Sequence, residues 1–122
     1  MAGSDAQDAE ELAVLLSLDG ERFRLDDGHW VKFEAARVEP SPHVPHGVKY
    51  SLTLHDRYNQ RILGYDNVHA VTGRKRRYQA RRQVWDHRHE GSWVEPYDFD
   101  SPAKLLEDFW ADVERVTGSG SG

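Results

Sequence analysis

The sequence predicts an α+β domain, a mainly antiparallel, twisted sheet of about five to six strands with a C-terminal helix packed on one face. Two observations predict this fold. Between Trp30 and Tyr65, stretches of alternating apolar and polar residues are separated by turns rich in glycine, proline and aspartate. After Pro102, the apolar residues recur instead at the helical period of about 3.6 residues. The 122 residues suffice for one core, and four Trp, five Tyr and four Phe supply bulky side chains to fill it.

The domain is expected to run from residue 12 to residue 117. Residues 1–11 are small, polar and acidic, which predicts a disordered tail. Residues 118–122, GSGSG, are typical of an added linker. The chain has no membrane-length apolar run and no signal peptide pattern, so we expect a cytoplasmic protein with no membrane contact. It has no cysteine, which excludes disulfides and thiolate zinc sites.

Alternation and turn residues together define the expected strands. The clearest is Val48–Asp56, in which every second residue is apolar. The other strands are expected at residues 12–18, 22–25, 30–38, 61–65 and 78–89. A short helix over Tyr78–Val84 is the competing prediction for the last of these segments. The C-terminal helix is expected to begin with Ser101 as N-cap and Pro102 at its first position, and to end near Thr117–Gly118.

The strongest chemical signal is the pair His87 and His89. On an extended segment, two residues that are two apart project to the same side. Imidazole titrates near neutral pH, so such a pair can supply a general base and a general acid. RNA cleavage without a metal needs both, together with a cation that steadies the phosphate, for which Arg82 and Arg88 are candidates.

Two other readings of the histidine pair stay open. The same spacing suits a metal ion, with Asp86, Asp66 or a loop histidine completing the ligand set. The two side chains are also compatible with a polar loop that has no function. Asp66 and Asn67 end the preceding strand, where Asp66 either orients a histidine or closes a turn.

A basic segment precedes the histidines. Residues 74–88 carry seven arginine or lysine residues and one acid, a charge of +6, whereas the whole chain carries −5 and the remainder therefore −11. This asymmetry indicates one face that meets a polyanion or an acidic partner. Arg81 and Arg82 are candidate phosphate contacts, and Trp85 is a candidate for stacking on an unpaired base.

Several of these elements, in order, resemble the TumE family of toxins from toxin–antitoxin modules. The resemblance spans about Leu12 to Val116. It rests on Gly64-Tyr65-Asp66-Asn67, His87-Arg88-His89 with Gly91, Glu95-Pro96-Tyr97-Asp98-Phe99, Leu105-Leu106 and Asp108-Phe109-Trp110-Ala111-Asp112-Val113. The basic stretch between Asn67 and His87 is longer than in the family pattern.

The resemblance implies a growth-inhibiting toxin that is restrained by a helix-turn-helix antitoxin and has RNA as its target. The matching positions carried over are Asp66, Asn67, His87 and His89. Our leading hypothesis is a metal-independent endoribonuclease that needs no cofactor. The alternatives are a non-catalytic module that binds RNA or a protein partner, and a nucleotide-modifying toxin that needs a cosubstrate.

Overall fold

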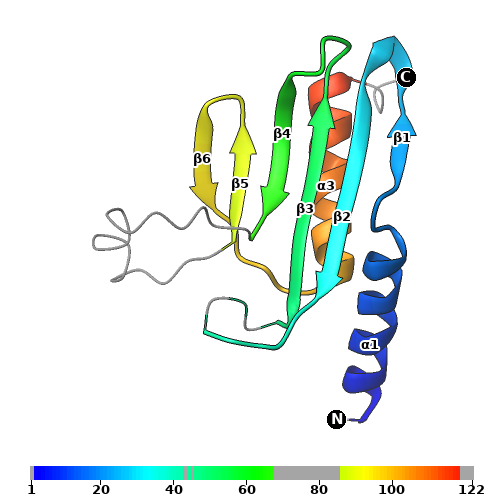
Figure 1. Ribbon diagram of the computed structural model, residues 1–122, viewed down its shortest axis with the longest axis vertical. Coiled ribbons are helices and arrows are strands. Elements are labelled where there is room, and N and C mark those ends of the chain that lie inside the picture. Colours follow the sequence, from blue (N-terminus) through cyan, green and yellow to red (C-terminus); the bar gives the residue numbers. More distant parts are fainter. Residues whose placement is uncertain (1, 43, 45, 68–85, 119–122) are drawn as a thin grey trace.

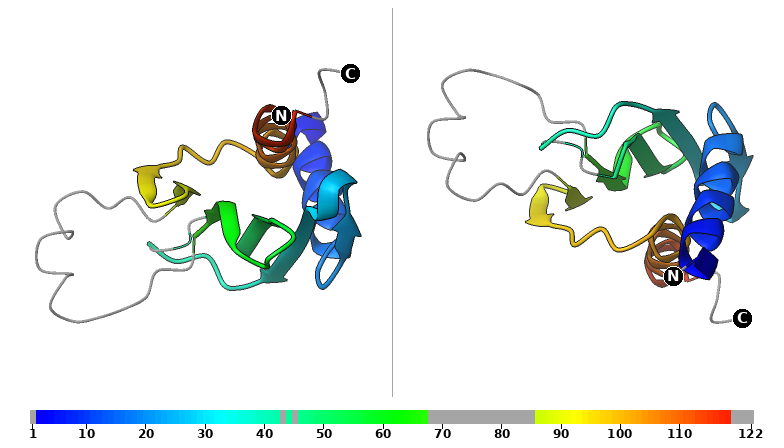
Figure 2. Two further views of the ribbon diagram at one scale, coloured as in Figure 1. Left: turned by 90° about the horizontal axis from the view of Figure 1, so that it is seen from above. Right: turned by 90° about the horizontal axis from the view of Figure 1, so that it is seen from below.

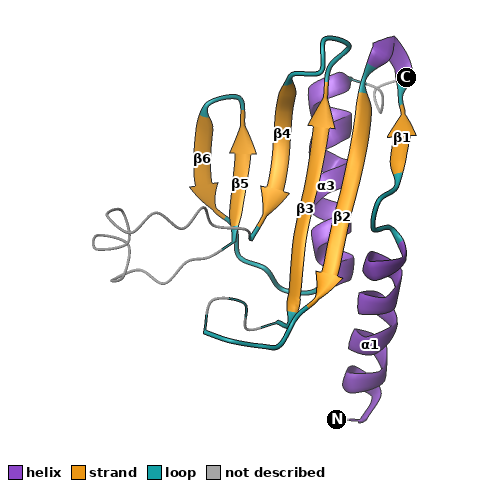
Figure 3. Ribbon diagram, viewed as in Figure 1, coloured by secondary structure: helices purple, strands orange, loops and turns teal. Residues whose placement is uncertain are grey.

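The structure is a computed structural model that describes residues 2–42, 44, 46–67 and 86–118. Within these ranges the chain forms a six-stranded antiparallel sheet and two α-helices (Figures 1 and 3). The strands follow one another in chain order across the sheet. The elements are α1 (Ala2–Ser17), β1 (Arg22–Arg24), a 3-10 turn (Asp26–Gly28), β2 (Trp30–Arg37), β3 (Val48–His55), β4 (Arg61–Asp66), β5 (His87–Glu90), β6 (Trp93–Pro96) and α3 (Pro102–Thr117). The predicted α+β fold is confirmed.

The core lies between the sheet and the helices. Strands β2, β3 and β4 place alternate apolar side chains on one face, as their sequence pattern predicts. From α3, Leu105, Phe109 and Val113 pack onto this face, and Phe109 meets Phe33 edge to face with ring centroids 5.6 Å apart. Seen along the sheet, α1 and α3 lie side by side (Figure 2).

Both ends of α3 match the sequence prediction. Ser101 is extended and its Oγ accepts a hydrogen bond of 3.1 Å from the backbone nitrogen of Lys104. Pro102 occupies the first turn, where its missing N–H leaves no bond unmade. Gly118 ends the helix in the left-handed region at φ 74°, a conformation that glycine adopts without strain.

The first predicted strand is wrong. Residues 12–17 belong to α1, which reaches back to Ala2 in place of the disordered tail expected for residues 1–11. Leu15 is fully buried against the core, whereas its neighbour Val14 is 54% exposed, so the apolar run is not buried along its whole length. A short apolar run does not distinguish a buried strand from a helix, and the helix formers before it decide the outcome.

The strand predicted for residues 78–89 is described only at its end. Residues 78–85 lie outside the described ranges, and His87–Glu90 forms β5. Strand β6 was not predicted. It follows the tight turn at Gly91 (φ 59°) and ends with Pro96 on the outermost strand, a position where proline removes no ladder bond.

Within the described part of the chain, helices pack on one face of the sheet but not on the other. Helix α3 lies over one face, with contacts to β4 and α1. No described helix lies on the opposite face of β3, β4 and β5, which we call the open face. Side chains that alternate with the core residues project there, among them Lys32, Thr53 and His55.

Candidate active site on the open face

Strand β5 sends its residues alternately to the two faces of the sheet. Arg88 and Glu90 reach residues of α3, so His87 and His89 project to the open face, as their spacing predicts. Their ring centroids lie 6.4 Å apart and the rings are inclined by 52°. This separation is about the ordinary spacing of same-side neighbours on a strand, so the two rings are adjacent along β5.

Asp66 joins the histidines on the same face. It is the last residue of β4 and lies directly opposite His87 in the register of the sheet. Its Oδ2 lies 3.2 Å from Nε2 of His89, and only 9% of the residue is exposed. The carboxylate therefore lies in direct contact with the His89 ring and favours a proton on Nε2.

Asn67 has a structural part in this arrangement. Its side-chain amide donates to the backbone oxygen of Val48 at 2.7 Å and accepts from the backbone nitrogen of Tyr50 at 2.9 Å. The residue is buried, so both amide ends are used within the fold. Asn67 thus fastens the end of β4 to β3 and holds Asp66 in place.

Arg88, a sequence candidate for phosphate binding, lies on the other face. Its guanidinium contacts Asp112 at 2.7 Å, Glu90 at 2.6 Å and Glu95 at 3.1 Å. The hydrogen bond that Arg88 donates to Asp112 in particular raises the pKa of Arg88 above its ordinary value, despite partial burial. Arg88 connects β5 to β6 and α3, and its charge is already balanced by carboxylates.

A different cation lies close to His89. A Cβ placed on Gly64 would lie 3.5 Å from Cδ and 3.6 Å from Nη1 of Arg61, so the Arg61 side chain extends over Gly64. Gly64 is the partner of His89 in the sheet register. Arg61 was not among the residues that the sequence pattern indicated. The signal that finds it is the register shift at Leu54/His55, which brings Arg61 opposite His55.

A second carboxylate lies beside His87, on the core side. Asp86 is buried, and its Oδ2 accepts a hydrogen bond of 2.7 Å from the hydroxyl of Tyr50. Burial raises the pKa of Asp86, although the Tyr50 hydrogen bond and the charges of His46 and His87 act in the opposite direction. Burial and the same carboxylate raise the pKa of the Tyr50 hydroxyl.

The remaining sequence candidates, Arg81, Arg82 and Trp85, lie outside the described residues. Within the described ranges, no group of three or more histidine, aspartate or glutamate side chains is placed to hold a metal ion. On the open face the structure brings together two imidazoles, a carboxylate that contacts one of them, and a cation: His87, His89, Asp66 and Arg61.

A family model described as Toxin TumE matches residues 7–117. The chain belongs to this family. The matched range includes the whole open-face cluster, so the cluster lies within the TumE domain itself. As a member of a toxin family, the chain is expected to have an antitoxin partner. No significant match was found among curated proteins or among solved structures. None of the helices in the described ranges is long and apolar enough to span a membrane.

Proposed function

We propose that this TumE-family toxin is a metal-independent endoribonuclease that acts in the cytoplasm, with His87 and His89 as its acid–base pair. The observation that carries the proposal is the placement of both imidazoles on the open face, with Asp66 Oδ2 3.2 Å from His89 Nε2. A helix-turn-helix antitoxin is the partner that we propose to restrain it.

The roles of the two histidines follow from the Asp66 contact. We assign the proton of a neutral His89 to Nε2, 3.2 Å from Asp66 Oδ2, which leaves the lone pair on Nδ1 and suits a general base. His89 takes the proton of a ribose 2′-hydroxyl, and the 2′-oxygen forms a bond to phosphorus. The bond from phosphorus to the 5′-oxygen breaks, and a protonated His87 donates its proton to that leaving oxygen. The products are a 2′,3′-cyclic phosphate and a free 5′-hydroxyl.

The proposed substrate contacts come from two places. Arg61, beside Gly64 and His89, steadies the charge that develops on the phosphate oxygens. Arg81, Arg82 and Trp85, which precede β5 in the chain, remain candidates for binding the RNA strand.

The test is incubation of the purified protein with total RNA in EDTA, beside the double variant His87→Ala/His89→Ala and the control His29→Ala. We expect cleavage by the wild type and by the control, and a loss of at least about 10²-fold in the double variant, because each general acid or base contributes that much or more. The absence of cleavage by the wild type, with added divalent metal and with ribosomes as well, would contradict the proposal.

A second candidate is a module that binds RNA without cleaving it. The observation that favours it is the number of cations and aromatic rings on the open face away from the histidines, including Arg22 and Trp30. The two candidates differ in one result, because a binder retains RNA affinity in the double histidine variant and cleaves RNA in neither form.

A further inference from the structure

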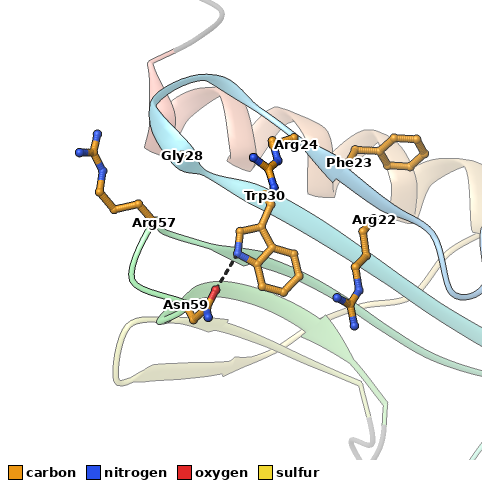
Figure 4. A pocket seen from close by; sticks show the side chains of 7 residues that line it. All are labelled: Arg22, Phe23, Arg24, Gly28, Trp30, Arg57 and Asn59. Atoms are coloured by element: carbon orange, nitrogen blue, oxygen red, sulfur yellow. Dashed lines mark hydrogen bonds between the residues drawn. The ribbon is translucent and has the colours of Figure 1, made fainter.

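A cavity of about 720 Å³ lies on the open face near the sheet edge opposite the histidine pair, between β1, β2 and the turns that follow β1 and β3 (Figure 4). Phe23 packs edge to face on Phe33 in the core, so Arg22 and Arg24, on either side of it in β1, project to the open face. The cavity is lined by Arg22, Phe23, Arg24, Gly28, Trp30, Arg57 and Asn59. Three guanidinium groups and no carboxylate belong to this lining.

The three arginines retain their positive charge for a ligand. Arg22 lies over the ring of Trp30, with its Cζ 5.5 Å from the ring centroid, and Arg57 donates to the backbone oxygen of Asp27 at 3.2 Å. None of the three forms an ion pair within the described part of the chain. The nearby carboxylate of Asp56 already accepts from two backbone nitrogens of its own turn. A phosphate is the ligand that complements such a cluster.

The cavity also contains a fixed aromatic surface. The indole of Trp30 stacks on His55, with ring centroids 4.1 Å apart and an angle of 11° between the planes. Its Nε1 donates to Oδ1 of Asn59 at 3.2 Å, so the ring is held at one face and at its edge. An aromatic ring beside arginines is the combination that binds the base and the phosphate of a single-stranded nucleotide.

The sheet register connects this cavity to the histidine pair along one face. Trp30 is opposite His55, His55 is opposite Arg61, and the next row contains Lys32, Thr53, Gly64 and His89. Trp30 and His89 are thus three strands apart, roughly 14 Å across the sheet, and they are also offset by two residues along the strands. This separation exceeds the distance between adjacent phosphates, so a strand of RNA with one phosphate at the histidines needs further nucleotides to reach Trp30.

We infer that the cavity formed by Arg22, Arg24, Arg57 and Trp30 is a second RNA subsite, which binds a phosphate and a base several nucleotides from the bond that is cleaved. The inference rests on the proposed function for the identity of the ligand, and it adds a requirement for substrate length and a set of residues away from the chemistry.

The experiment measures binding without cleavage. A fluorescent octanucleotide RNA with 2′-O-methyl groups, which has no 2′-hydroxyl to attack, is titrated with each protein at several salt concentrations. The variants are Arg22→Gln/Arg24→Gln in β1 and Arg57→Gln in the turn after β3. Lys104→Gln is the control, because it removes one positive charge from exposed α3. Thermal unfolding checks that each variant is folded, and the two variants come from different elements.

We expect both cavity variants to bind the octanucleotide roughly tenfold more weakly, with a slope of log affinity against log salt that is smaller by about 0.7 for each phosphate contact removed. Lys104→Gln should keep the wild-type affinity and slope. Unchanged affinity and slope in both folded cavity variants would overturn the inference, and so would a wild type that does not bind the octanucleotide. If the wild type binds the octanucleotide but does not cleave total RNA in the cleavage test, the catalytic proposal fails while the subsite stands.

Discussion

Asp66 and Asn67 are adjacent in the chain but have separate roles at the end of β4. The side-chain amide of Asn67 forms two hydrogen bonds with the backbone of β3, one as donor and one as acceptor. It thereby takes the place of a backbone amide in a neighbouring strand. Asp66 points to the open face and holds His89. Both residues are buried, and a buried polar group without a partner costs about 1–3 kcal/mol, so the bonds that they make determine their positions.

The contact between Asp66 and His89 leads to a prediction for Asp66→Asn. Asparagine keeps the shape of the side chain but lacks the carboxylate that fixes the His89 ring and its tautomer. We expect kcat for RNA cleavage to fall by about 10- to 100-fold, less than the full effect of losing a general base, with little change in KM. The exposed Asp98→Asn is the control. Wild-type kcat in the Asp66 variant would show that Asp66 only closes the end of the strand.

The site shows how far residue patterns reach. The alternation of a strand correctly placed His87 and His89 on one face, and the same rule places Arg88 on the other, where Asp112 binds it. Arg88 was assigned to the phosphate because it is next to the histidines in the sequence. Its side of the strand, which the same alternation predicts, was not taken into account. Arg61 lies 26 positions before His87 in the sequence, and only the sheet register, with its shift at Leu54/His55, brings it near.

Among the elements, β5 depends most on charge. It is four residues long, and Arg88 binds it to Asp112 of α3, while Glu90 binds Arg115 of the same helix at 2.7 Å. The hydrogen bonds from Arg115 and Arg88 lower the pKa of Glu90. Burial acts to raise the pKa of Asp112, but the bonds from Arg88 and Tyr65 outweigh it and the pKa is lowered. The strand that presents the histidines is thus fastened by groups on its reverse side.

Arg88→Met is expected to destabilise the fold by roughly 1–3 kcal/mol at neutral pH, between the values for exposed and buried ion pairs. A carboxylate whose pKa is lowered by folding stabilises the protein above its unfolded pKa, and this contribution is lost as pH falls through the folded pKa. The ordinary values are 4.5 for Glu90 and 3.8 for Asp112, so the wild type loses this stability below about pH 4.5.

The difference in stability between the wild type and Arg88→Met should therefore be largest at neutral pH and shrink in acid. Asp86 has a raised pKa and acts in the opposite sense, but it is present in both proteins and cancels in the difference. Urea unfolding at pH 7 and pH 3 measures the effect, with Lys104→Met, an exposed pair, as control. A difference that is independent of pH would show that Arg88 contributes only by packing.

The sequence did not show that α1 is a helix. The run Leu12–Leu18 is apolar enough for a strand, and its length does not exclude one. The burial of Leu15, with Leu12 and Leu16 packed against the core, follows the three- and four-residue spacing of a helix. The later strands and α3 were predictable because turn residues and helix-capping residues mark their ends in the sequence. The contacts of α1 with α3 and β2 bury this apolar stripe, and neither contact can be read from the run Leu12–Leu18 itself.

The whole molecule divides into an acidic helical side and a basic open face. The exposed side of α3 carries Glu107 and Glu114, whereas Arg22, Arg24 and Arg61 project from the open face or its rim, where Lys32 pairs with Glu34 at 3.1 Å. The net negative charge of the chain therefore does not indicate that one face is positively charged and suits RNA. The sequence analysis located positive charge only at residues 74–88, because the open-face cations are distributed over strands that meet only in the sheet.

This division predicts where RNA touches the protein. Trp93 is 63% exposed and pairs with Glu90, so it lies on the side of the sheet that faces α3, whereas Trp30 is half-buried on the open face. If exposure alone decided contact, a photoreactive RNA that contains 4-thiouridine would cross-link mainly to Trp93. Because the cations surround Trp30, we expect cross-links at Trp30 and near the histidines, weakened by added salt, and few at Trp93. Mass spectrometry of the cross-linked peptides distinguishes the two patterns, and a dominant Trp93 adduct would place RNA on the helical side and remove the basis for both the catalytic site and the second subsite.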